Sequence, residues 1–300
     1  MAEAETGKEG YFSGWTFFDT CCLSELVKLA DSGEGERVRE FVRGRDIVLP
    51  LTAIQELRRA ASLANRIPDV VASANVYEVP HPTKFWDCDI WNFLNTTRIP
   101  RNILEASPFD LRKFQFLIAL ELPIFARAEH MAGDPFRVQI ERDRQAGVDE
   151  QKLVTLVWSK VNEIARDQYR IEVPIADCRP ENFPAIFTFF YLYYFRFLAQ
   201  KRVVPKPNDF VDLAHGSIAP YCVDFYAEQK MVQLLRRQVK GRVAPTPFHA
   251  AKRLSKEGYI DPTQLERARQ SEDMKRETAP LLPNTNLITH MEMREAILAM

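Results

Sequence analysis

Five acidic residues stand just after a predicted strand or in the first turns of a predicted helix. They are Asp19, Glu56, Asp209, Asp212 and Glu228. Clustered carboxylate oxygens are the ligands that hard divalent cations such as Mg²⁺ and Mn²⁺ prefer. Ions held in this way activate water and stabilise a leaving oxygen, typically during the hydrolysis of phosphate esters. This chemistry requires a fold that brings the five carboxylates together.

The first carboxylate follows a strongly apolar run. The letters WTFF at 15–18 favour a strand, and the apolar residues between Leu23 and Ala30 recur at the spacing of an amphipathic helix. Asp19 therefore stands at a strand-to-helix turn. Because Asp is also a favoured helix N-cap, a purely structural capping role is the alternative for this residue.

A second strand–helix unit carries the next acid. The letters IVL at 47–49 predict a short buried strand, and Thr52 followed by Gln55 gives the capping-box pattern that starts a helix. Glu56 lies in the second turn of that helix. A further strand is predicted within 75–83.

A third unit spans residues 205–237. Its short helix begins at Asn208 or Asp209, and Asp212 lies one turn further along. The letters YCVDFYA at 221–227 predict a strand that Glu228 follows, and the next helix covers 230–240. The letters GRVAP at 241–245 are the predicted last strand.

The alternation of strands and helices predicts an α/β fold, a three-layer sandwich with a mainly parallel central sheet. The carboxyl ends of parallel strands meet at one edge, which is where open α/β sheets bind ligands. Carboxylates gathered there would repel one another unless helix N-termini or bound cations offset their charge. Mg²⁺ or Mn²⁺ is therefore the expected cofactor.

The motifs FFDTCCLSEL, LPLTAIQEL, NDFVDLAH and PYCVDFYAE, in this order, resemble the PIN-domain family of metal-dependent nucleases, in particular a bacterial PIN-like branch. The resemblance covers about residues 14–64 and 205–243. It implies a ribonuclease that hydrolyses phosphodiester bonds with Mg²⁺ or Mn²⁺. The catalytic and metal-binding positions that it implies are Asp19, Glu56, Asp209 or Asp212, and Glu228.

The chain departs from the family pattern around its last predicted motif. The family's strand often ends in a hydroxyl residue followed by Asp, but this chain has Ala227 and Glu228. The PIN-like branch has an acid where Val223 stands, and Asp224 falls on the opposite face of the strand. The alternative is therefore a PIN-like module that binds nucleic acid or protein with weak or no catalysis.

A phosphatase of the haloacid-dehalogenase type is a further alternative, since that family also has an Asp after its first strand. It needs a second Asp two residues later, where this chain has Cys21. We interpret Cys21 and Cys22 as small buried residues. His215 is interpreted as a hydrogen-bonding core residue, and the aromatic stripe at 187–197 as core rather than a base-stacking surface.

The expected PIN-like domain covers 11–243 and contains a helical insertion at about 81–204, and a polar helical extension covers 244–300. Helices are predicted over 108–131 and 149–168. The apolar segment 183–199 is predicted to be a buried core helix, because it is short for a membrane span and contains Arg196.

The net charge of −1 gives no global field that would attract nucleic acid. Lys and Arg nevertheless outnumber Asp and Glu over 229–276, and a positive helix face can contact phosphates as well as solvent. The candidates for binding nucleic acid, with RNA as the expected partner, are Arg236, Arg237, Lys240 and Arg242.

The five cysteines contain no CxxC pair, which argues against a disulfide framework and a zinc site. The polar N-terminus is unlike a signal peptide. A cytoplasmic protein without a membrane partner is expected. An inhibitory protein partner and a homodimer both stay open.

Overall fold

The computed structural model describes residues 14–50, 52, 53, 56, 61–79, 82–95, 135–149, 152–200, 202–206, 208–239, 247–273 and 285–300. A five-stranded sheet crosses the molecule in the order β3-β2-β1-β4-β5, and all four neighbouring pairs are parallel. The predicted α/β fold with a parallel sheet is confirmed. The strands are β1 (Trp15–Phe18), β2 (Asp46–Pro50), β3 (Asn75–Val79), β4 (Cys222–Ala227) and β5 (Asn286–Thr289).

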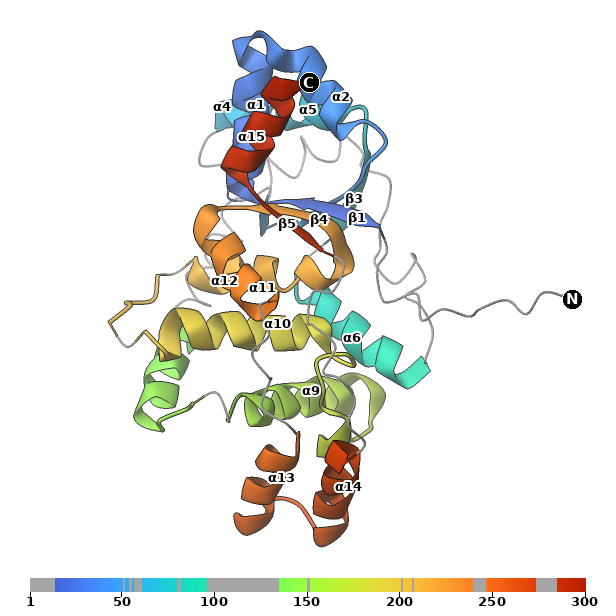
Figure 1. Ribbon diagram of the computed structural model, residues 1–300, viewed down its shortest axis with the longest axis vertical. Helices are drawn as coiled ribbons and strands as arrows, with labels where there is room; N and C mark the ends of the chain where they lie inside the picture. Colours follow the sequence, from blue (N-terminus) through green and yellow to red (C-terminus); the bar gives the residue numbers. More distant parts are fainter. Residues whose placement is uncertain are drawn as a thin grey trace, which may run out of the picture.

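One face of the sheet is covered by helices from both ends of the chain (Figure 1). These helices and Phe18 of β1 share one apolar core. Gly33 has a φ of 104°, a left-handed conformation that glycine adopts without strain, and it separates the first two long helices of this layer. The elements are α1 (Thr20–Leu29), η1 (Ala30–Glu34), α2 (Gly35–Val42), α4 (Ala61–Ala64), α5 (Ile67–Val71) and α15 (His290–Ala299).

The other face carries a thicker helical layer with the larger core, which includes Trp15, Phe17 and Phe225 of the sheet. The sheet thus lies between two helical layers, as expected for a three-layer sandwich (Figure 1). The elements nearest the sheet are α6 (Lys84–Asn95), α10 (Pro184–Tyr193), η5 (Tyr194–Leu198), α11 (Asp209–Gly216), η6 (Ala219–Tyr221) and α12 (Gln229–Val239). Further out lie helix 135–145, α9 (Leu153–Tyr169), η4 (Ile175–Asp177), α13 (Pro247–Lys256) and α14 (Pro262–Asp273).

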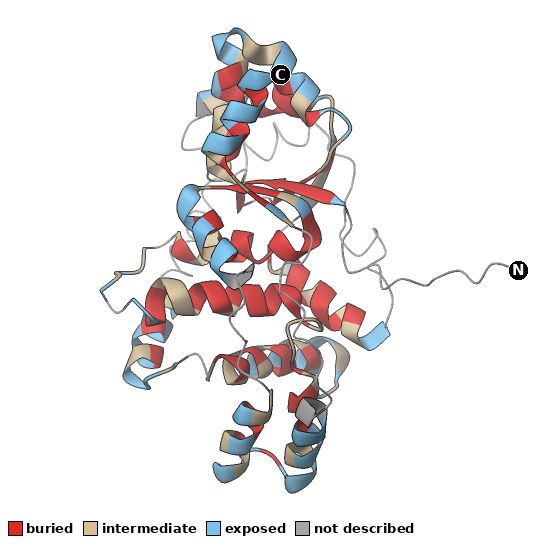
Figure 2. Ribbon diagram, in the orientation of Figure 1, coloured by how far each residue is buried: buried red, intermediate tan, exposed pale blue. Residues whose placement is uncertain are grey.

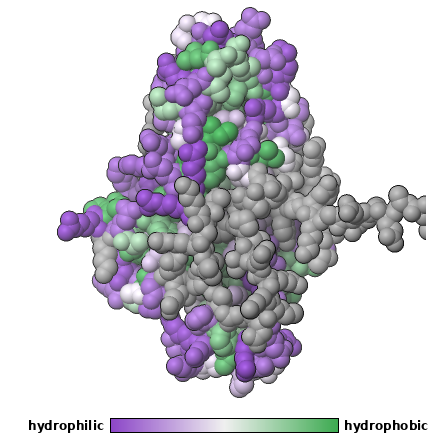
Figure 3. Space-filling model, viewed as in Figure 1, coloured by the Kyte–Doolittle hydropathy of each residue, from purple (hydrophilic) through white to green (hydrophobic). Residues whose placement is uncertain are grey.

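The apolar segment 183–199 forms the centre of this second layer. All residues of α10 except Phe190 are buried (Figure 2), so the prediction of a core helix is confirmed. None of the described helices is long and apolar enough to cross a membrane. On the face seen in Figure 3, hydrophilic side chains cover much of the described surface of the outer helices.

One strand of the described sheet was not predicted. β5 comes from residues 286–289, within the segment expected to be largely helical, and it pairs with β4. The predicted strand 241–245 and the predicted helix 108–131 lie outside the described residues. The C-terminal extension therefore completes the sheet edge, and α15 follows β5 directly with a capping box at Thr289. The bounds of the two predicted domains stay predictions.

Candidate metal centre

A cavity of about 330 Å³ opens at the carboxyl ends of β1 and β4. Four of the five predicted acids line it, together with one histidine that the sequence analysis assigned to the core. Phe225, Ala227 and Met231 form apolar parts of its wall. The acids and the histidine that line it are Asp19, Glu56, Asp212, Glu228 and His215, and Cys21 also lies on the wall.

Asp19 connects the end of β1 to the start of α1. Its backbone N–H donates to the carbonyl of Tyr226 on the neighbouring strand at 2.8 Å, which fixes the turn. Its Oδ1 accepts a hydrogen bond from the N–H of Thr20 at 2.9 Å, so Asp19 is the N-cap of α1. Because Asp19 also lines the cavity, its capping role and its site role are compatible.

Glu56 is brought to Asp19 by the residue that follows Asp19. The hydroxyl of Thr20 donates to Oε2 of Glu56 at 2.5 Å. The start of α1 therefore contacts both carboxylates, and its exposed N–H dipoles favour the negative charge there.

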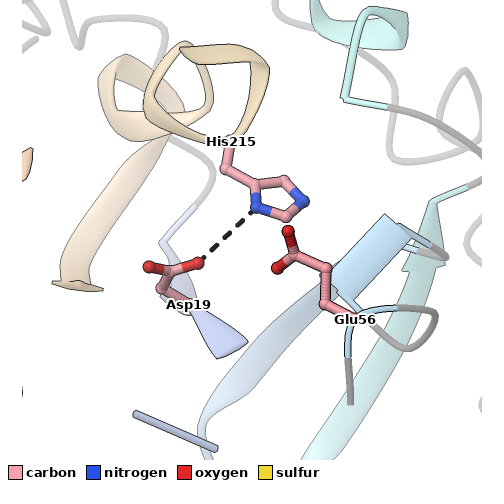
Figure 4. Close-up of side chains that lie close together, drawn as sticks. All are labelled: Asp19, Glu56 and His215. Atoms are coloured by element: carbon pink, nitrogen blue, oxygen red, sulfur yellow. Dashed lines mark ion pairs between the residues drawn. The ribbon is translucent and has the colours of Figure 1, made fainter. Parts of the chain in front are cut away.

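His215 lies in the last turn of α11 and is only 2% exposed. Its Nε2 shares a hydrogen bond with the hydroxyl of Thr52 at 2.7 Å. Its Nδ1 makes no hydrogen bond within the described part of the chain and lies 3.5 Å from Oδ1 of Asp19. One ligand atom each from Asp19, Glu56 and His215 lie within 4.8 Å of one another, and the imidazole points toward the two carboxylates (Figure 4).

The place of His215 in this cluster was not predicted from the sequence. The available signal was its spacing, since His215 follows Asp212 by three residues and the two side chains share one side of α11. Tight packing also positions this helix. A Cβ added at Gly216 would clash with Leu192 and crowd Met231, so glycine allows α11 to approach α10 and α12 closely.

Asp209 does not line the cavity, which corrects the expectation that it would. The side chain is 3% exposed. Its Oδ1 accepts from Arg196 at 2.5 Å, and its Oδ2 accepts from the backbone N–H of Lys206 at 2.5 Å. Both oxygens thus have donors inside the protein. Of the two alternatives on α11, Asp212 is the one that faces the cavity.

The position of Asp212 in a crowded acidic site changes its protonation. Burial raises the pKa of Asp212 to about 7, and the charges of Asp19 and Glu56 add to the rise, while Arg196 opposes it. Arg196 donates to Oδ2 of Asp212 at 3.2 Å. At neutral pH a substantial fraction of Asp212 is therefore protonated when no cation is bound.

His215 responds to the same charges in the opposite way. Burial by itself lowers the pKa of His215, but the contact with the Asp19 carboxylate, together with the charges of Glu56 and Asp212, outweighs burial and raises the pKa above its ordinary value. Negative charge in the cavity thus contributes to both shifts, although burial is the main cause for Asp212. A cation at this position would relieve that repulsion.

Glu228 lines the cavity from the junction of β4 and α12. Asp224, the displaced acid of the same strand, is not among the lining residues. Its carboxylate binds Arg45 and accepts from the side-chain amide of Asn286 at 2.9 Å. The carboxylate of Asp224 therefore connects β4 to Arg45, which precedes β2, and to Asn286 of β5.

Of the four basic candidates, Arg236 and Arg237 belong to the described residues, whereas Lys240 and Arg242 lie outside them. Arg236 donates to the carbonyl of Leu287 at 2.7 Å and to Glu292 at 3.1 Å, which ties α12 to β5 and α15. Arg237 is exposed. Binding of nucleic acid by these residues stays a prediction.

None of the protein-family models, curated proteins or solved structures compared with this chain gave a match. The fold and the geometry of the cavity therefore carry the functional argument. They define an α/β protein with a parallel sheet and a group of carboxylates and one histidine that could hold a metal ion.

Proposed function

We propose that this protein is a metal-dependent nuclease that hydrolyses phosphodiester bonds, with RNA as its substrate. The observation that carries the proposal is the meeting of Asp19 and Glu56 with Asp212 and Glu228 in one cavity at the carboxyl edge of a parallel sheet. That edge is the general ligand-binding position of open α/β sheets.

The donors in the cavity fit a divalent cation. They are mostly carboxylate oxygens, and the buried Nδ1 of His215 has no hydrogen-bond partner in the described part of the chain. A bound cation would activate water and stabilise the leaving oxygen of a phosphodiester. The residues that would hold it are Asp19, Glu56, Asp212 and Glu228.

Other side chains keep these carboxylates in position. Thr20 orients Glu56 by its hydroxyl hydrogen bond, and Arg196 holds Asp212 on the cavity side of α11. Phe225 and Met231 give the cavity apolar walls, which reduce the access of bulk water and strengthen charge interactions inside.

The sequence resemblance to PIN-domain nucleases supports the choice of nucleic acid. The motif acids Asp19, Glu56, Asp212 and Glu228 all line the same cavity. Asp19 and Glu56 also lie close enough to share one ion with His215. RNA as the substrate comes from that resemblance alone. Mg²⁺ and Mn²⁺ are the ions to test.

A second candidate function is a PIN-like module that binds nucleic acid or a protein with weak or no catalysis. The observation that favours it is the position of Asp209, whose oxygens are both bound by Arg196 and Lys206 instead of facing the cavity. Glu228 in place of a family Asp points the same way.

Cleavage assays on the full chain separate the two candidates. End-labelled single-stranded RNA is incubated with the protein and Mg²⁺, Mn²⁺ or EDTA, and Asp19→Asn serves as the inactive comparison. Cleavage that requires a divalent ion and disappears in Asp19→Asn supports the nuclease. RNA binding without cleavage, in wild type and variant alike, supports the binding module.

A further inference from the structure

We propose that His215 is itself a metal ligand through Nδ1, and that the centre consequently binds Mn²⁺ more tightly than Mg²⁺. The inference rests on the proposed function for the location of the site. The inference adds a nitrogen ligand to that proposed site and chooses between the two candidate ions.

The first argument is the state of the two ring nitrogens. His215 is 2% exposed, and its Nδ1 lacks a hydrogen bond within the described part of the chain. A buried polar atom without a partner is costly, and such atoms in native proteins usually have a functional explanation. The distance of 3.5 Å to Oδ1 of Asp19 is too long for a good N–H···O hydrogen bond.

The second argument is the partner of the other nitrogen. Nε2 lies 2.7 Å from the hydroxyl of Thr52, a buried residue of the segment that also carries Glu56. When Nε2 carries the proton and donates it to Thr52, Nδ1 keeps its lone pair. Metal-bound histidines are commonly fixed in this way by a hydrogen bond from the second ring nitrogen.

The orientation of the His215 ring also supports its role as a ligand. The imidazole ring points toward the carboxylates of Asp19 and Glu56 (Figure 4), and one donor atom from each of the three residues fits within 4.8 Å. An ion between them would therefore receive two carboxylate oxygens and one imidazole nitrogen. Each donor comes from a different strand–helix unit, so the fold itself assembles the set.

The kinds of donor atom in the site decide which ion binds more tightly. Imidazole nitrogen suits first-row transition metals, whereas Mg²⁺ prefers oxygen ligands and keeps several of its waters. Mn²⁺ accepts both kinds of donor. Adding one nitrogen to the carboxylates should shift the balance toward Mn²⁺ by at least about 10-fold, comparable to the effect of changing a group near a metal.

The test measures metal binding on the full chain without substrate. Affinities for Mn²⁺ and Mg²⁺ are measured by calorimetry, and pulsed electron paramagnetic resonance of the Mn²⁺-loaded protein detects coupling to a ¹⁴N ligand. We expect at least about 10-fold tighter binding of Mn²⁺ and a clear ¹⁴N coupling.

Three variants locate the nitrogen. His215→Asn puts an amide group near the position of Nδ1 and should remove the ¹⁴N coupling and weaken Mn²⁺ binding about 10-fold or more, with Mg²⁺ binding changed far less. His290→Asn is the matched control, because the Nδ1 of His290 also lacks a partner in the described part of the chain but the residue does not line the cavity. His290→Asn should leave the affinities for both ions and the ¹⁴N coupling unchanged.

Thr52→Val tests the positioning residue. Loss of the hydroxyl should weaken Mn²⁺ binding and alter the ¹⁴N coupling without abolishing it, and Thr52→Ser should restore both. Thermal unfolding of every variant shows whether it is folded. If His215→Asn does not fold, Thr52→Val and the wild-type coupling still decide.

The outcomes keep the two proposals apart. A wild-type protein that cleaves RNA with metal but shows no ¹⁴N coupling, or binds Mg²⁺ as tightly as Mn²⁺, overturns the inference and leaves the nuclease intact. A His215-dependent ¹⁴N coupling without any cleavage supports the inference and removes the nuclease. Absence of any metal binding overturns the inference, and the cleavage assay then judges the nuclease separately.

Discussion

A buried acid and a group of partly exposed acids are built in opposite ways in this molecule. Asp89 of α6 is completely buried, and both of its oxygens have neutral donors: Oδ1 accepts from the hydroxyl of Tyr221 at 2.5 Å, and Oδ2 accepts from the N–H of Ile186 at 2.9 Å. At the sheet edge, Asp19 instead faces a cavity that holds three further carboxylates and His215.

Asp89 therefore supports the fold, whereas the acids of the cavity are able to bind a ligand. Asp89 satisfies an N–H in the first turn of α10, where no residue of that helix caps it. Burial raises the pKa of Asp89 well above its ordinary range, although its hydrogen bonds oppose the rise. The cavity instead gathers four carboxylates beside one histidine, an arrangement that can hold a cation.

The largest expected effect is on activity. Asp19→Asn should reduce metal-dependent RNA cleavage by at least about 100-fold, because it removes a charged ligand from the cavity. The melting temperature should stay the same or rise, because the change also removes one of several repelling charges and Asn caps helices well. Cleavage rates and thermal unfolding measure the two effects.

Asp87→Asn is the control, since Asp87 is an acid outside the cavity that pairs with Lys84. It should keep full cleavage. Unfolding of Asp19→Asn would mean instead that Asp19 serves the fold as Asp89 does, and the contrast between the two regions would disappear.

The next effect is on stability. Asp89→Ala should lower the free energy of unfolding by about 2 kcal/mol or more, because it leaves the N–H of Ile186 and the hydroxyl of Tyr221 buried without their acceptor. Chemical denaturation measures the change, with Asp87→Ala as the control. A variant as stable as wild type would show that Asp89 does not support the start of α10.

A smaller effect is the pH dependence that Asp89 creates. A raised pKa in the folded state means that the stabilising protonated form is fully present below the unfolded pKa, about 3.9, and is lost as pH rises through the folded pKa. Over that window the wild type should lose up to about 1.4 kcal/mol of stability per pH unit from this group.

Asp89→Asn cannot titrate at this position, so its stability relative to wild type should increase as pH rises. Denaturation at several pH values between 4 and 8 checks the trend. A constant difference between the two proteins across this range would show that Asp89 keeps an ordinary pKa.

Sequence patterns predicted the parallel arrangement because the strands at 15–18, 47–49 and 221–227 are apolar runs next to helix signals. The strand within 75–83 was also predicted, but without such a signal. β5 was missed, since NLIT is only four residues long and lies in a polar segment whose pairing with β4 depends on the whole sheet. Local patterning cannot show such a distant partner.

The candidate site was predicted as far as topology allows. Strand ends and helix starts were sufficient to bring Asp19, Glu56, Asp212 and Glu228 to one cavity. They could not separate Asp209 from Asp212, because both acids bind Arg196 and the difference depends on the backbone N–H of Lys206, which binds Asp209. They also could not show that one nitrogen of His215 would be buried without a hydrogen-bond partner among the described residues.

The smallest expected effect concerns two neighbouring arginines on α12, which differ in their partners as the two acidic regions do. Both side chains are exposed, but Arg236 donates to Glu292 and to the carbonyl of Leu287, whereas Arg237 forms no hydrogen bond or ion pair with the described part of the chain. We expect Arg237→Gln to flatten the slope of log affinity against log salt concentration by about one unit, the value for one lost phosphate contact.

Arg236→Gln should leave this slope unchanged and lower stability slightly, by about 0.5 kcal/mol, as for an exposed ion pair. Fluorescence anisotropy with a short labelled RNA over a salt series measures both variants, each made in an Asp19→Asn background so that the RNA stays intact. Because each variant removes one positive charge from the same helix, a difference between their slopes shows which of the two side chains contacts RNA. Equal slopes for wild type and Arg237→Gln would show that α12 is only a solvated face and that RNA contacts the protein elsewhere.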